Sequence, residues 1–146
     1  MLSRHFTLAE FLHSDKANEL GDPNTPEEKH LRALHATACG MEQVRAILGG
    51  EPVTITSGYR NPRVNAAVGG VPTSAHALGY AADFYHSQLP PYDAAKALEK
   101  SLLAFDQLIL ETSRNIIHVS FDPRMRRQVM TQPNGPGTPC LPGIVR

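Results

Sequence analysis

Two histidines and one aspartate in the second half of the chain could bind a metal. Asp83 follows His76 by seven residues, and His118 lies in a separate segment. Two neutral imidazoles and one carboxylate, with a fourth position left for water, are typical ligands of hydrolytic zinc sites. A histidine in an apolar strand is more often an ordinary core or surface residue. On spacing alone, both interpretations stay open.

Strand patterns around Asp83 and His118 predict how the two side chains are presented. Residues 81–85 and 116–121 are rich in apolar and β-branched side chains, which favours strands. Because side chains alternate along a strand, we expect Asp83 and His118 each to face away from the apolar side. Adjacent strands would then present both to one cleft. The seven-residue gap is too long for one helical turn, so His76 is expected on a loop.

The remaining patterns predict the elements that position these residues. Apolar periodicity, caps and turn signals indicate helices over 7–13, 25–48 and from 92 to 105, a short helix from 61, a strand over 53–56, and a hairpin of 107–111 with 116–121. Thr25, Pro26 and Glu28 resemble the start of a capped helix. This order predicts an α+β fold: a small single domain with an antiparallel sheet flanked by helices.

From residue 131 onward the composition changes. Pro133, Pro136, Pro139 and Pro142 recur every third residue, with glycines between them. We therefore divide the chain into a domain over 1–130 and a Pro/Gly-rich tail over 131–146, expected to lie extended on the surface or to be partly disordered. Cys39 and Cys140 form no C-x-x-C pair, which favours free thiols over a single disulfide.

Charge and hydropathy exclude several kinds of partner. The 146 residues carry 14 basic and 14 acidic side chains, so no basic surface is expected to attract nucleic acid. No stretch reaches the length of a membrane span, and the N-terminus lacks the apolar core of a signal peptide. We expect a monomer made in the cytoplasm.

Three separated motifs resemble the zinc D-Ala-D-Ala carboxypeptidases and the related murein endopeptidases of the LAS group. The motifs are Ser57-Gly58-Tyr59-Arg60, then Ser74-x-His76 with Asp83 seven residues on, then His118-Val119-Ser120. The resemblance covers roughly residues 1 to 125 and implies the hedgehog/DD-peptidase-like fold. It implies that His76, Asp83 and His118 bind Zn²⁺.

The same resemblance assigns roles to three further residues. Arg60 would stabilise the oxyanion or bind the substrate carboxylate, a task that suits a guanidinium. Ser74 would hydrogen-bond the peptide backbone of the substrate, and Tyr59 would shape the cleft.

The general base departs from the family pattern. Many relatives place an acidic residue three positions before the distal histidine, where this chain has Asn115. A four-residue hairpin turn would bring Glu111 opposite Ile116, so Glu111 is the candidate base. Asp106 and Asp122 are weaker candidates because the faces on which they lie are less certain.

The resemblance therefore implies a zinc-dependent peptidase that cleaves peptidoglycan stem peptides, next to D-alanine or between L-alanine and D-glutamate. One alternative is a D,D-dipeptidase. Another is a non-catalytic zinc-binding module on the same scaffold, which Asn115 favours. The lack of an export signal suits a phage or prophage enzyme that reaches the cell wall by another route.

Overall fold

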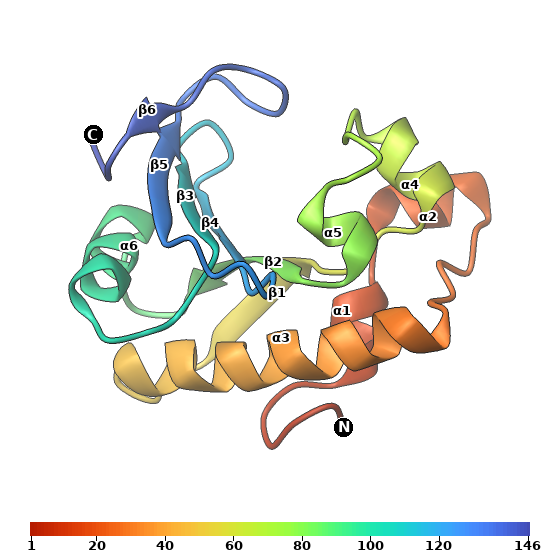
Figure 1. Ribbon diagram of the computed structural model, residues 1–146, viewed down its shortest axis with the longest axis horizontal. Coiled ribbons are helices and arrows are strands. Elements are labelled where there is room, and N and C mark those ends of the chain that lie inside the picture. The colour runs from red at the N-terminus through yellow and green to blue at the C-terminus, as the bar shows by residue number, and fades with distance from the viewer.

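The computed structural model describes residues 1–146 and contains six helices and six strands (Figure 1). The helices are α1 (Leu8–Leu12), α2 (Asp15–Leu20), α3 (Glu28–Ile47), α4 (Pro62–Ala67), α5 (Ala75–Leu78) and α6 (Pro91–Lys100). The strands are β1 (Val53–Ser57), β2 (Ala81–His86), β3 (Gln107–Glu111), β4 (Ile116–Ser120), β5 (Gln128–Gln132) and β6 (Leu141–Pro142). These elements form a small single α+β domain, as predicted.

The strands form one sheet in the order β1-β2-β4-β3-β5-β6. Every neighbouring pair is antiparallel except β3 and β5, which run parallel. The hairpin of β3 and β4 was predicted, and its register places Glu111 opposite Ile116. In the β2–β4 pair Asp83 lies opposite His118. The strand pattern indicated the face on which each side chain lies, and the pairing of β2 with β4 brings the two together.

One face of the sheet and the inner faces of α3 and α6 form the core. Phe84 and Ile117 are completely buried there, together with Leu34 of α3 and Leu98 of α6. Burying a side chain of this size contributes about 1.5–3 kcal/mol. Asp83 and His118 lie between these apolar positions along their strands and so face away from the core. None of the helices has the length and hydropathy of a membrane span.

The start of α3 differs from the prediction. The helix begins at Glu28 with Glu27 as its N-cap, not at Thr25. The backbone N–H of Glu27 donates to Nδ1 of His30 at 3.4 Å. The His30 ring packs on Tyr59 with the ring centroids 4.9 Å apart. The helix thus starts where His30 makes a tertiary contact with Tyr59, and the local sequence pattern does not indicate that contact.

The segment after residue 130 is part of the sheet. The boundary expected between 130 and 131 falls inside β5, and β6 pairs with β5 at the edge of the sheet. Thr131 and Ile144 are buried. Pro142 lies in β6, where an edge position tolerates a residue without an N–H group. Both cysteines are free.

Candidate metal centre and cleft

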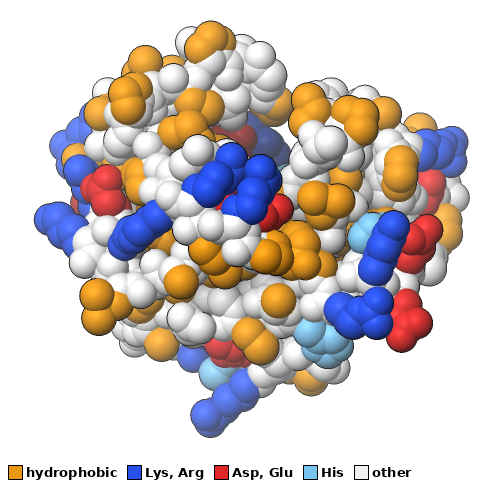
Figure 2. All heavy atoms as spheres, viewed as in Figure 1, with side chains coloured by type: hydrophobic (Ala, Val, Ile, Leu, Met, Phe, Trp, Pro, Cys, Tyr) orange, Lys and Arg blue, Asp and Glu red, His pale blue; other side chains and the backbone are white.

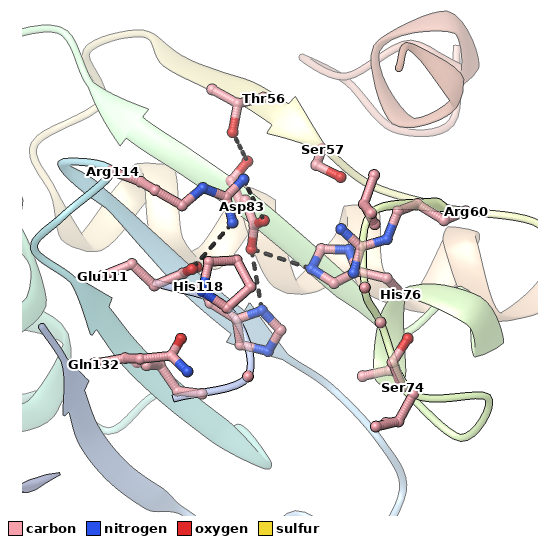
Figure 3. Close-up of a pocket in the computed structure, with 18 of the residues that line it drawn as sticks. Thr56, Ser57, Arg60, Ser74, His76, Asp83, Glu111, Arg114, His118 and Gln132 are labelled. Atoms are coloured by element: carbon pink, nitrogen blue, oxygen red, sulfur yellow. Dashed lines mark hydrogen bonds and ion pairs between the residues drawn. The ribbon is translucent and has the colours of Figure 1, made fainter. Parts of the chain in front are cut away.

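The side chains of His76, Asp83 and His118 meet above the sheet (Figure 3). Nε2 of His76 lies 3.1 Å from Oδ1 of Asp83, and Nδ1 of His118 lies 3.0 Å from the same oxygen. One nitrogen or oxygen from each residue lies within 4.8 Å of the others. The structure therefore brings together the three residues predicted to bind a metal, from α5, β2 and β4.

A backbone carbonyl orients His76. The ring Nδ1 lies 2.7 Å from the carbonyl oxygen of Gly58, which can only accept a hydrogen bond. Nδ1 therefore carries the proton, and Nε2 presents its lone pair to the cluster. Burial lowers the pKa of His76, although the attraction of Asp83 opposes this. The neutral imidazole, which is the form that binds metals, is thereby favoured.

Asp83 supplies the negative charge. Burial alone would raise the pKa of its carboxyl group, but the ring nitrogens of His76 and His118 that face Oδ1 outweigh this whenever they carry protons, and they lower the pKa. Donor atoms bound to zinc at about 2.0–2.2 Å in a tetrahedral arrangement stand roughly 3.3–3.6 Å apart. The 3.0 and 3.1 Å separations of the cluster are close to that spacing. The donor atoms are of the kinds that bind zinc, and all three lie within 4.8 Å of one another.

Glu111 lines the same cleft from β3 and is buried. Burial and the nearby charge of Asp83 raise its pKa, while Arg114 opposes the shift. Nη1 of Arg114 donates to Oε1 of Glu111 at 3.1 Å, and Nη2 lies 3.9 Å from Oδ2 of Asp83. Arg114 lies in the β3–β4 turn and was not predicted as a site residue. The sequence feature that could have identified Arg114 is that it follows the candidate base Glu111 by three residues.

The two weaker candidates for the base lie outside the cleft. Asp106 accepts hydrogen bonds from Arg126 at 2.8 Å, and Asp122 accepts one from Arg124 at 3.0 Å. Both carboxylates are thus engaged at the connection between β4 and β5. Asn115, the position at which relatives carry an acid, lines a separate hollow of about 410 Å³. Among these four residues, only Glu111 lines the cleft with the metal ligands.

Arg60 approaches the cluster from the opposite side (Figure 3). Its guanidinium makes no ion pair, and its buried Nε has no hydrogen-bond partner. Burial lowers the pKa of Arg60, with the charge of Asp83 opposing, yet a guanidinium stays charged at neutral pH. A half-buried arginine whose buried Nε has no acceptor is unusual in a folded protein. Arg60 is therefore available to a negatively charged or carbonyl group in the cleft.

The other two predicted substrate-binding residues are engaged within the protein. Ser74 lines the cleft, but its hydroxyl caps α5 by accepting from Ala77 N–H at 3.2 Å and donates to Asn65 at 3.1 Å. Tyr59 belongs to the hydrophobic core and is only 2% exposed. The Tyr59 ring does not line the cleft, because the chain turns there and directs it toward His30.

The cleft has a volume of about 500 Å³ and opens between two walls. Figure 2 shows it as a notch between two lobes, with charged side chains in its depth. One wall comprises the start of α2, the loops that follow β1 and α4, and α5; the other comprises β3, the β3–β4 turn, the end of β5 and the segment after it. The residues from α2 and from 132–137 that line it were not predicted, because nothing local in their sequence indicates a binding site.

A metal-binding cluster at the base of an open cleft, next to a buried carboxylate, is typical of metal-dependent hydrolases. The chain matches the peptidase M15 family over residues 4–120. It belongs to this family, that of the zinc D-Ala-D-Ala carboxypeptidases and LAS-type peptidases. No curated protein matches the chain closely enough to serve as a named relative.

Proposed function

We propose that this protein is a zinc peptidase that hydrolyses peptide bonds in peptidoglycan stem peptides. The observation that carries the proposal is the set of groups in one cleft: the His76–Asp83–His118 cluster, the buried carboxylate of Glu111 and the unpaired guanidinium of Arg60. Family membership supports a peptidase. The bond cleaved is next to D-alanine or between L-alanine and D-glutamate.

His76, Asp83 and His118 would hold the metal. Zinc bound by them supplies Lewis acidity, which acidifies an attacking water and polarises the scissile carbonyl. The Gly58 carbonyl keeps His76 in the tautomer that presents Nε2. Asp83 contributes the one negative charge of the ligand set, so one positive charge remains to attract a carbonyl or carboxylate of the substrate.

Glu111 serves as the general base. It accepts the proton of the attacking water and delivers it to the leaving amine. A carboxylate with a raised pKa suits the first half of this exchange, because it is a stronger base toward the attacking water than an ordinary glutamate. Arg114 donates to Oε1 and limits the directions in which the carboxylate can turn.

Arg60 stabilises negative charge. Its guanidinium lies across the cluster from Glu111 and has no partner in the protein. A donor already desolvated and held in place needs little reorganisation when charge develops on the substrate oxygen. The alternative role, binding of a substrate carboxylate, uses the same donors.

A non-catalytic zinc-binding module is the competing interpretation. Asn115 supports it, because relatives have an acid at that position. In this protein Asn115 lines a hollow on the other side of the turn, whereas Glu111 lines the cleft. A carboxylate is thus available to the metal centre from β3, which favours the enzyme.

The test is the variant Glu111→Gln in the zinc-loaded protein. We expect kcat for release of peptides from murein to fall roughly 10²- to 10⁴-fold, the usual contribution of a general base, with zinc content unchanged. Asn115→Gly is the control from the same hairpin: glycine keeps the left-handed conformation of this position (φ 54°), so the variant should keep full activity. Mass spectrometry of digests of intact murein and of free D-Ala-D-Ala separates a murein peptidase from a D,D-dipeptidase.

Unchanged hydrolysis by Glu111→Gln would show that Glu111 is not the base. If the zinc-loaded wild-type protein releases no peptide from murein and does not cleave D-Ala-D-Ala, the non-catalytic interpretation is correct.

A further inference from the structure

Part of the cleft is built by residues beyond the family match. That match ends at residue 120, yet Gln132, Pro136 and Gly137 line the cleft. They reach it because β5 pairs in parallel with β3 and continues into the segment 133–140. In Figure 1 this segment forms the loop above β3 and β5, on the side that faces α4 and α5. We call Gln132 and residues 133–140 the C-terminal wall.

Gln132 lies next to the proposed base. The parallel register pairs Gln132 with Glu111 and Met130 with Ile109, and Ile109 itself lies opposite His118. Because alternate residues share a face, Gln132 points to the side of the sheet that carries Glu111 and His118. Figure 3 shows the Gln132 carboxamide close to Glu111 at the edge of the metal centre.

One hydrogen bond fixes the orientation of this carboxamide. Nε2 of Gln132 donates to the carbonyl oxygen of Thr138 at 2.9 Å. A carbonyl oxygen can only accept, so the amide nitrogen is turned toward the wall and Oε1 is turned away from it. No donor in the protein bonds to Oε1. Gln132 therefore offers the cleft an acceptor that is already oriented.

The C-terminal wall is itself held in place. Thr131, beside Gln132, donates through Oγ1 to the Gly143 carbonyl at 2.7 Å and accepts from the N–H of Val145 at 3.0 Å. The N–H of Thr138 donates to the carbonyl of Gly135 at 3.3 Å. Buried Ile144 anchors the chain beyond the wall in the core. A recognition group on such a fixed segment loses little entropy on binding.

From these contacts we infer that Gln132 is a substrate-recognition residue and that its Oε1 accepts a hydrogen bond from a backbone N–H of the peptide substrate. The inference rests on the proposed function, since it takes the substrate to be a peptide. Arg60, across the cleft, offers only donors. A peptide that spans the cleft would therefore turn a carbonyl or carboxylate toward Arg60 and an N–H toward Gln132, which sets its direction across the metal centre.

The experiment compares Gln132→Leu with wild type, both zinc-loaded and full-length. The substrates are a stem pentapeptide and a set of the same peptide with one backbone nitrogen methylated in each. We expect Gln132→Leu to raise KM for the unmodified peptide roughly 2- to 10-fold with little change in kcat, the loss of one neutral hydrogen bond. One methylated peptide should bind wild type poorly and lose no further affinity for the variant. A merely structural role would weaken every peptide alike.

Gln43→Leu is the matched control. It replaces an exposed glutamine of α3 that makes no side-chain hydrogen bond and does not line the cleft, so KM should stay at the wild-type value. Binding is also followed without turnover, by titrating the pentapeptide and recording the side-chain amide signals of Gln132 in ¹H–¹⁵N spectra. Shifted signals support the inference even if no peptide is cleaved.

Two results would overturn it. One is hydrolysis of the pentapeptide with the same KM and the same pattern across the methylated set in Gln132→Leu. The other is a titration in which the Gln132 side-chain signals do not move. A failure of the proposed function alone is recognised by shifted signals without hydrolysis.

Discussion

The two walls of the cleft are held by different interactions. Asp83, His118 and Glu111 stand on β2, β4 and β3, where ladders of backbone hydrogen bonds fix the strands. Arg60 lies on a loop and His76 on the four-residue α5. Hydrogen bonds between side chains and backbone groups hold the chain there. We call the side of the cleft built by β2, β4 and β3 the sheet wall, and the side built by α5 and the loop of Arg60 the helical wall. A side chain of the sheet wall can be removed while its ladder of backbone hydrogen bonds remains. In the helical wall, the position of one functional group depends on the polar side chain of another residue.

Asn24 is the clearest example of the second kind. It is buried, and its Nδ2 donates to the carbonyl oxygens of Leu12 at 2.9 Å and Tyr59 at 2.8 Å. Its Oδ1 accepts from the N–H of Asn61 at 2.9 Å. The Asn24 carboxamide thus links the residues before and after Arg60 to the end of α1.

The largest expected effect is loss of the metal, and it compares the walls directly. His118→Ala and His76→Ala should each abolish zinc binding and lower activity roughly a thousandfold or more, since a catalytic metal contributes several kcal/mol. Only His76→Ala leaves a backbone carbonyl, that of Gly58, without its partner. Melting of the metal-free variants should therefore show a lower Tm for His76→Ala, by several degrees. Equal Tm values would contradict the difference between the walls.

Asn24→Ala should have the next largest effect, on stability. Three backbone groups lose their partner, and we expect a loss of roughly 2–4 kcal/mol in the free energy of unfolding. The measurement is urea unfolding of the metal-free protein. Asn18→Ala, an exposed asparagine of α2, is the control and should change little. A loss below about 1 kcal/mol would mean that the ladder of the sheet, rather than Asn24, positions this wall.

Asp106 tests whether the sheet wall also depends on a side chain. Hydrogen bonds from Arg126 hold the pKa of Asp106 at about 2, below its ordinary value of 3.8. Because the folded-state pKa is depressed, the stabilisation is present above about pH 4 and disappears as the pH falls toward 2. Asp106→Asn should cost about 1–2 kcal/mol at pH 7.

Unfolding of Asp106→Asn and wild type is compared between pH 7 and pH 2, and the two should converge at the acid end. If the difference in unfolding free energy between the two proteins stays constant across this range, the charge of Asp106 does not contribute to stability. Zinc affinity should be unchanged, since Asp106 lies outside the cleft.

The smallest effect is expected for Ser74→Ala. The Ser74 hydroxyl caps α5, and losing such a cap costs about 1 kcal/mol. If the hydroxyl also binds the substrate backbone, KM rises in addition; if it only caps α5, KM stays within about twofold of wild type. Ser74→Thr keeps the cap and should restore stability, so steady-state kinetics on both variants distinguish the two roles.

The sheet wall could be predicted from the sequence and the helical wall only in part. The alternation of apolar residues around Asp83 and His118 determines which side chains face the cleft, so the expectation that both face one cleft was correct. The length of the hairpin turn correctly placed Glu111 opposite Ile116. The roles of Arg60, Ser74 and Tyr59 came from a motif. A motif does not say that the Tyr59 ring turns into the core.

The segment after residue 130 shows a second limit. Its prolines indicated an extended tail, and β6 is indeed extended, but the parallel pairing of β5 with β3 joins residues about twenty positions apart across an intervening strand. No local pattern near Gln132 points to Glu111. The predicted start of α3 was wrong for a similar reason, because His30 contacts both Glu27 and the distant Tyr59.

Gly58, whose carbonyl orients His76, also limits which substitutions the metal centre can tolerate. A Cβ at this position would lie 2.6 Å from the carbonyl oxygen and 2.8 Å from the Cα of Phe11, both backbone atoms that cannot simply swing aside. The N–H of the next residue donates to that same oxygen at 2.7 Å. Even alanine would push the end of β1 away from α1 and take the carbonyl of residue 58 with it. In a saturation screen, Gly58 should therefore be among the least replaceable residues, although it does not bind the metal and has no side chain.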